Sequence, residues 1–374
     1  MKYKIGHSTS IPAANPKLRF EVFRKKMMEA TGKVLDGGNY ILGEEVENFE
    51  KHFAQFIGTE YCIAVNSGTD AISLSLLAVG VKPEDEVITT SLTAPATVSA
   101  ILNIGATPVI VDVEAPEYCI STEAVKAAIT INTKAIVPVH LHGYAAPVKE
   151  LAHLAEKYSL HIIEDCAQAH GAKMGDDKLG SLGICGAFSF YPTKNLGCMG
   201  DGGAITTNDP SIAQKLYALR NYGINTEGVI KSNGKNSRMD ELQAAYLNIQ
   251  LPDLEDYNKR RVFYAKAYAV RFKDYADLLP PIIEGANYHQ YPIRLTNRDD
   301  FRGRLMEKGI ATNIHYELTM KDHPNFVKYC KNIPNAEYAA RHFVSLPIQP
   351  EILDVHFEEI VSKVLLTLRE LQAY

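Results

Sequence analysis

Between about residues 43 and 221, short apolar runs alternate with segments that carry apolar side chains at helical spacing. The segment Glu44–Phe56 shows this spacing clearly, because Val46, Phe49, Phe53 and Phe56 form one apolar stripe. The apolar runs predict strands at Cys62–Val65, Glu86–Thr90, Pro108–Val113, Ala135–His140, His161–Glu164, Ala187–Phe190 and Ala204–Thr207. Helices are predicted between them at Asp70–Val79, Ala96–Asn103, Thr122–Ile129 and Val148–Tyr158. This alternation is typical of an α/β fold with a mostly parallel, doubly wound sheet.

Beyond Pro252 the pattern changes to charged helices around an isolated strand. The expected elements are helices Leu254–Tyr268, Asp299–Lys308 and Val355–Leu371 and a strand at Tyr288–Leu295. We therefore expect a large α/β domain at residues 1–250 and a smaller C-terminal α+β domain at residues 251–374. About the first 25 residues offer no core of their own and are predicted to pack on one of these domains.

Composition narrows the class of protein. The 374 residues carry 39 basic and 44 acidic side chains, and the net charge of −5 argues against a nucleic-acid partner. No apolar run approaches the ~20 residues that span a bilayer, and the N-terminus lacks the apolar core of a signal peptide. Six cysteines without a paired motif suit a reducing compartment, so we expect a cytoplasmic protein. No metal site is expected, because the histidines at 140, 142, 161 and 170 lie at strand ends and in loops.

The first candidate for chemistry is Asp165, which ends the apolar run Ile162-Ile163-Glu164. Open α/β sheets bind ligands at the carboxyl ends of their strands, where this side chain is predicted to lie. An isolated aspartate at such a turn is more often a helix cap or a solvated charge.

The second candidate is Lys194, which follows a short apolar strand and precedes the glycine-rich segment Gly197–Gly203. Most lysines in loops are solvated charges. A lysine held between a buried strand and a glycine loop can lose solvation, lower its pKa and attack a carbonyl group.

The third candidate is the segment Ser67-Gly68-Thr69-Asp70, at the junction of a strand and a helix. The free N–H groups of a helix N-terminus bind phosphate, although the same residues also make an ordinary cap. The segment matches neither a P-loop nor a dinucleotide motif. Together, a phosphate cradle, an acid at a strand end and a presented lysine match the needs of pyridoxal phosphate (PLP).

At these residues the chain resembles the DegT/DnrJ-type sugar aminotransferases, a branch of the fold-type I PLP enzymes. The resemblance is carried by Ser67–Ala71, Glu164–Gln168, Phe188–Gly203 and Asn236–Ala245 and extends from Gly38 to the terminal helix. It implies a PLP cofactor, L-glutamate as amino donor and a nucleotide-linked keto-sugar as acceptor. It also implies a homodimer whose subunits share their active sites.

The resemblance assigns roles to particular residues. Lys194 resembles the lysine that links to the cofactor and carries the transferred proton, and Asp165 the partner of the pyridine nitrogen. Cofactor contacts are implied for Gly68, Thr69, Asp165, Gln168, Ser189, Lys194 and Asn236, of which Asn236 reaches the neighbouring subunit. Substrate contacts are implied for Tyr191, Arg238, His315 and Tyr316.

The lysine loop Lys194-Asn195-Leu196-Gly197 resembles the branch that aminates C3 of dTDP-linked 3-keto-6-deoxyhexoses. A 4-keto-sugar aminotransferase of the same family is the main alternative. A PLP dehydratase is disfavoured because its branch replaces the lysine by histidine, and a non-catalytic regulatory protein is disfavoured by the intact Lys194, Asp165 and Gln168. One departure is the absence of an aromatic residue at Thr93–Thr97, where many relatives stack a ring on the cofactor.

Overall fold

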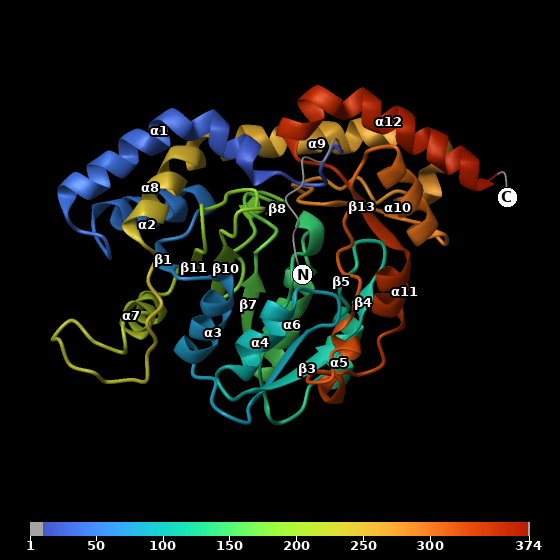
Figure 1. Ribbon diagram of the computed structural model, residues 1–374. Coiled ribbons are helices and arrows are strands. Elements are labelled where there is room, and N and C mark those ends of the chain that lie inside the picture. The colour runs from blue at the N-terminus through green and yellow to red at the C-terminus, as the bar shows by residue number, and fades with distance from the viewer. Residues whose placement is uncertain (1–9, 373–374) are drawn as a thin grey trace.

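The computed structural model describes residues 10–372 and is built on a seven-stranded sheet (Figure 1). The strands are β1 (Tyr61–Val65), β2 (Glu86–Thr90), β3 (Thr107–Val111), β6 (Thr133–Val137), β7 (His161–Asp165), β10 (Cys185–Ser189) and β11 (Gly203–Thr207). Their order is β1-β11-β10-β7-β6-β2-β3. Among these strands only β11 runs against the others. The predicted α/β class and mostly parallel sheet are confirmed.

Helices cover both faces of the sheet, as expected because its strands are apolar on both sides. They are α2 (Glu44–Ile57), α3 (Gly68–Ala78), α4 (Pro95–Leu102), α5 (Thr122–Ala128), α6 (Val148–Tyr158), α7 (Pro210–Leu219) and α8 (Glu241–Gln250). One core joins α3, α4 and α7 to the sheet, and another joins α2 and α8 to it. The predicted aromatic stripe of α2 is in the second core, where Phe53 meets Phe188 and Phe190 edge-on at 5.0 and 5.3 Å.

The C-terminal part consists of α9 (Leu254–Arg271), β12 (Tyr291–Arg294), α10 (Arg298–Glu307), α11 (Pro334–His342), β13 (Phe343–Leu346) and α12 (Pro350–Gln372). β12 and β13 pair as an antiparallel ribbon. Two further small ribbons are β4 (Val113–Glu114) with β5 (Cys119–Ile120), and β8 (Lys173–Met174) with β9 (Asp177–Lys178). One hydrophobic cluster joins Ile88 and Val111 of the large sheet to Tyr268 and Phe301, so the division at residue 250 stays a prediction.

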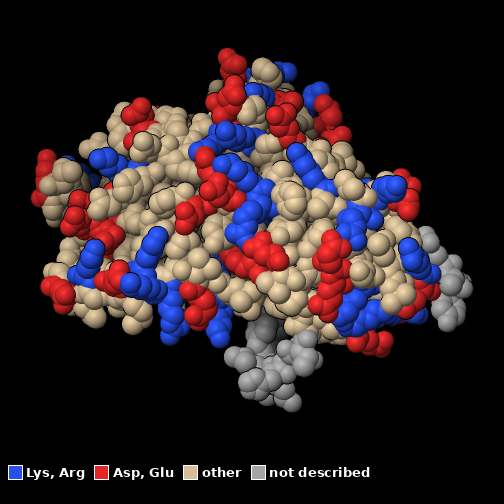
Figure 2. Space-filling view, turned by 90° about the horizontal axis from the view of Figure 1, so that it is seen from above, with Lys and Arg blue, Asp and Glu red and all other residues tan. Residues whose placement is uncertain are grey.

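The first helix of the described residues is the long α1 (Pro16–Gly37), which the sequence pattern did not predict. Phe23 and Met27 of α1 pack against Tyr246 and Tyr257, so the described part of the N-terminal segment packs on the rest of the molecule, while residues 1–9 lie outside the described residues. In Figure 1, α1, α9 and α12 run along the top of the molecule, above the large sheet. Basic and acidic side chains lie intermixed on the face seen from above in Figure 2. Within residues 10–372, no helix is long and apolar enough to cross a membrane.

Candidate active site

Asp165 ends strand β7 and is buried at the carboxyl edge of the sheet, as expected. Its Oδ2 accepts a hydrogen bond from Thr97 Oγ1 at 2.8 Å, and its Oδ1 accepts one from the N–H of Ala167 at 3.1 Å. Burial raises the pKa of Asp165, and Thr97, Ala167 and the charge of Lys194 offset this effect only in part. A cation beside this carboxylate would therefore stabilise its ionised form, which is what a protonated pyridine nitrogen supplies.

Lys194 lies in a tight turn after β10, in which its N–H donates to the carbonyl of Tyr191 at 2.8 Å. Desolvation lowers the pKa of Lys194 to about 8, although the charge of Asp165 acts in the opposite direction. About a tenth of such lysines are neutral at pH 7, far more than for an ordinary lysine. The structure thus gives Lys194 the free amine that attack on an aldehyde requires.

Buried polar side chains from both ends of the chain hold the lysine turn. Arg19 of α1 donates to the carbonyls of Lys194 and Asn195 and pairs with Glu351 at 3.0 Å. The side chain of Asn195 bonds Asn258 of α9 at 3.0 Å and His289 at 2.8 Å. The position of the lysine is therefore fixed by the first and last helices as well as by the sheet.

A phosphate-sized cradle forms where α3 begins. Gly68 opens the helix, and Ser67 caps it by accepting from the N–H of Asp70 at 3.1 Å. In the described chain the N–H groups of Gly68 and Thr69 bond no other group. A Cβ on Gly68 would lie 2.7 Å from Ser189 Cβ, so only glycine lets the end of β10 approach this helix so closely. These groups fit the phosphate of PLP.

Gln168 joins the acid side of the site to the C-terminal part of the chain. Its Oε1 accepts from the N–H of His142 at 2.6 Å, and its Nε2 donates to the hydroxyl of Tyr316 at 3.0 Å. His142 Nε2 lies 3.1 Å from the carbonyl of His315, whose Nδ1 is 2.9 Å from Ser345 Oγ. Burial lowers the pKa of His142 to about 4 and that of His315 to about 3, so both rings are neutral at pH 7.

The remaining predicted residues lie beyond this cluster. Ser237, between Asn236 and Arg238, donates to Asp70 at 2.7 Å and so ties their segment to the start of α3. The Arg238 guanidinium lies over the ring of Tyr222 at 5.4 Å. The side chain of Tyr191 is 53% exposed. Among the described residues, no hydrogen bond links the side chain of Tyr191, Asn236 or Arg238 to Lys194 or Asp165.

Three residues that hold the site were not predicted: Thr97, His142 and Arg19. Thr97 lies in the segment noted for lacking an aromatic ring, but a threonine on a helix gives no sign that it bonds a distant aspartate. The nearby histidine His140 has another role, because its Nε2 bonds Glu164 at 3.0 Å and its Nδ1 accepts from Ala146. Glu164 also accepts hydrogen bonds from three backbone N–H groups, so the buried His140–Glu164 pair holds the end of β7 in place.

Comparison with known proteins agrees with this geometry. Residues 22–365 match the DegT/DnrJ/EryC1/StrS aminotransferase family, and the chain belongs to this family. It is therefore a PLP-dependent aminotransferase, as the sequence predicted.

Particular relatives cover nearly the whole chain. It is 39% identical over 348 residues to a dTDP-3-amino-3,4,6-trideoxy-alpha-D-glucose transaminase of Streptomyces venezuelae, covering 91% of this chain and 92% of that protein. It is 37% identical to a pleiotropic regulatory protein of Geobacillus stearothermophilus, covering 95% and 98% of the two chains. A crystal structure of S. venezuelae DesV in complex with a ketimine intermediate is similar, with a TM-score of 0.91, 39% identity and coverage of 95% and 97%.

Proposed function

We propose that the protein transfers an amino group from L-glutamate to C3 of a nucleotide-linked 3-keto-6-deoxyhexose, with dTDP as the nucleotide. The observation that carries the proposal is the union of Lys194, Asp165 and the α3 cradle at one edge of the sheet. The position on the sugar is supported by the transaminase from S. venezuelae, whose name specifies a 3-amino sugar.

Each residue of the site has a separate role in the proposed reaction. PLP, when bound, supplies an electron sink that lets a carbon beside the amino nitrogen release its proton. Asp165 would hold the proton on the pyridine nitrogen, and Gly68, Thr69 and Ser189 would hold the phosphate. Gln168 would contact the ring. Lys194, with its pKa lowered to about 8, takes and returns the proton at the reacting carbon atoms.

The acceptor side of the site belongs to the same proposal. His315 and Tyr316 border the site through Gln168, and we assign them, with Tyr191 and Arg238, to the nucleotide-sugar. A guanidinium is suited to a diphosphate because it offers a planar fork of donors. The neutral His315 ring can donate a hydrogen bond without a charge.

The working form in this proposal is a homodimer in the cytoplasm. Helix α1 exposes apolar side chains, since Val22 is 63%, Met28 66% and Leu35 63% accessible, and such a surface favours a protein partner. Asn236 would reach the phosphate cradle of the neighbouring subunit. The division into domains near residue 250 is also retained, because the large sheet ends before it and the β12–β13 ribbon follows it.

The test is a direct competition of acceptors. The purified enzyme, its PLP and L-glutamate are offered dTDP-3-keto- and dTDP-4-keto-6-deoxyhexose, and kcat/KM is compared by mass spectrometry. We expect a clear preference for the 3-keto sugar. Preference for the 4-keto sugar overturns the position of amination, and absence of any cofactor conversion by glutamate overturns the aminotransferase itself.

A further inference from the structure

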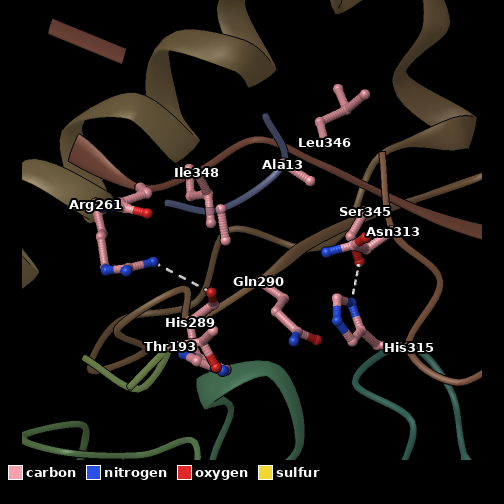
Figure 3. Close-up of a pocket in the computed structure, with 12 residues that line it drawn as sticks. Ala13, Thr193, Arg261, His289, Gln290, Asn313, His315, Ser345, Leu346 and Ile348 are labelled. Carbon is pink, nitrogen blue, oxygen red and sulfur yellow. Dashed lines mark hydrogen bonds between the residues drawn. The ribbon is translucent and has the colours of Figure 1, made fainter. Parts of the chain in front are cut away.

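A small cavity of about 140 Å³, lined by both polar and apolar side chains, adjoins the lysine turn (Figure 3). Its wall includes Thr193, Arg261, His289, Gln290, Asn313 and His315. The cavity lies between this turn, the segments that precede and flank the β12–β13 ribbon, and the chain around Ala13. Through Thr193 it therefore adjoins the turn that carries Lys194.

Arg261 in this wall is a buried cation without an ion pair. It is 3% exposed, and its NH1 donates to the carbonyls of Tyr288 at 3.4 Å and His289 at 3.1 Å. Its Nε has no hydrogen-bond partner in the described chain. Each of the other buried arginines among residues 10–372 pairs with a carboxylate: Arg19 with Glu351, Arg220 with Glu50 and Arg298 with Asp299.

An unpaired buried charge is costly, and the protein's own acids offset the charge of Arg261 only in part. The acid that acts on it is Glu351, whose Oε1 pairs with Arg19 and whose Oε2 has no hydrogen-bond partner in the described chain. Desolvation, followed by the charge of Arg19, lowers the pKa of Arg261 to about 9. The guanidinium is therefore poised to gain from an added anion.

The rest of the wall suits a carboxylate. The pKa values of His289 and His315 are lowered by burial, and the charge of Lys194 acts in the same direction on both. Both rings are thus neutral at pH 7. The side-chain carbonyl of Gln290 is also unpartnered, and its amide can offer N–H donors when turned over. The wall presents one cation, several neutral donors and no free acid.

We propose that this cavity binds the side-chain carboxylate of the amino donor, with Arg261 as its cation and Gln290 as a second contact. The inference rests on the proposed function, because it gives the amino donor a place beside Lys194. Every amino acid carries an α-carboxylate, so selection of a dicarboxylate needs a second cation. A buried site that is completed only by the correct ligand rejects analogues that leave its polar group unpaired.

The first experiment measures binding without reaction. Glutarate has the two carboxylates of glutamate but no amino group, and butyrate has one carboxylate. Both are titrated calorimetrically into the PLP-loaded enzyme. We expect glutarate to bind much more tightly than butyrate, and Arg261→Gln to weaken glutarate by about 10- to 100-fold, as for loss of a charged hydrogen bond.

The second experiment measures selection of the donor. Conversion of the cofactor to its amino form is followed by absorbance at varied L-glutamate and L-alanine. We expect Arg261→Gln and Gln290→Glu to raise the glutamate concentration for half-maximal conversion by about tenfold or more while changing alanine little. Arg260→Gln is the matched control, because Arg260 is the next residue of α9 and pairs with Asp354 at the surface.

The outcomes separate the two proposals. Loss of glutamate selection in the variants, with alanine and the control unchanged, supports the carboxylate site. Unchanged glutarate binding, or equal losses for glutamate and alanine, overturns it while the aminotransferase stands. If Arg261→Gln does not fold, Gln290→Glu decides. A wild-type enzyme that responds to no amino acid overturns the proposed function itself.

Discussion

The two sides of the active site differ in how much of their support comes from this chain. The lysine turn is bonded by Arg19 from α1 and through Asn195 by Asn258 from α9. The segment of Asn236 and Arg238 is bonded to the start of α3 by Ser237 and to Asn221 by Arg238 at 3.1 Å, and neighbouring Tyr222 is 45% exposed. The loop that precedes this segment extends from the body of the molecule near α7 (Figure 1).

In the proposed function, the buried side with Lys194 carries out the chemistry, and the exposed side recognises the acceptor sugar. In the proposed reaction, proton transfer depends on a lysine whose pKa is lowered by desolvation and whose turn is held by buried contacts from one chain. The side chains of Tyr191, Tyr222 and Ile230 are instead 53%, 45% and 66% exposed, which leaves them open to contact with a partner. The predictions below alter first the buried side of the site and then the exposed side.

The largest effect is expected for Lys194→Ala. Without the amine there is neither a covalent link to the cofactor nor a proton carrier, so turnover falls below about 1% because general-base catalysis alone contributes ~10²–10⁴-fold. The fold should remain, since Lys194 Nζ forms no hydrogen bond within the described chain. Turnover is measured by mass spectrometry and the fold by circular dichroism. A variant that keeps more than a few per cent of the activity contradicts the role.

Asp165→Asn should have the next largest effect. The amide cannot hold the pyridine proton by charge, although it can keep the bond from Thr97, so loss of a charged hydrogen bond predicts about 10- to 100-fold weaker retention of PLP. Dialysis followed by absorbance measures retention. The control Glu60→Gln changes an exposed acid just before β1, at the opposite end of that strand from the cradle. Equal retention by the wild type and Asp165→Asn would refute the pairing.

The pH dependence of cofactor loading tests the environment of Lys194. Its pKa is lowered to about 8, so the neutral amine becomes available as pH rises through 8 rather than near 10.5. The rate at which the cofactor-free protein binds PLP should therefore rise about tenfold between pH 6 and 7 and level off above 8. Stopped-flow absorbance measures this rate. A rate that still climbs in proportion to hydroxide at pH 9 contradicts the lowered pKa.

Features of the fold and of the site could be predicted where the residues that determine them lie close together in the sequence. The strands and helices between residues 43 and 221 follow from apolar runs that alternate with segments of helical spacing, because a sheet covered on both faces needs continuously apolar strands and one-sided helices. Helix α11 and strand β13 were missed, since β13 has only four residues and follows α11 without an intervening turn. Lys194, Asp165 and Gly68 were predicted from short segments. Arg19 and Thr97 were not, because their roles come from contacts 175 and 68 positions away in the chain.

The exposed side of the site gives the last and smallest effect. If Asn236 serves the neighbouring subunit, Lys194→Ala inactivates the site of the subunit that carries it, whereas Asn236→Asp inactivates the site of its partner. The added carboxylate of Asn236→Asp would repel the phosphate. In a hybrid dimer both changes then fall on one site, and the other site is intact. Unfolding, mixing and refolding the two variants at equal amounts should restore about a quarter of wild-type activity, since half of the dimers are hybrids with one intact site each.

The control for this experiment is each variant refolded alone, which should regain no activity. Sedimentation of the mixture checks that dimers have formed. If Asn236 instead serves its own subunit, every site in the hybrid carries one change, and the mixture stays as inactive as its components. That result would place the whole cofactor site within one chain and remove the contrast between its two sides. Recovery of activity would show that the exposed segment beside Ser237 completes the phosphate cradle across an interface.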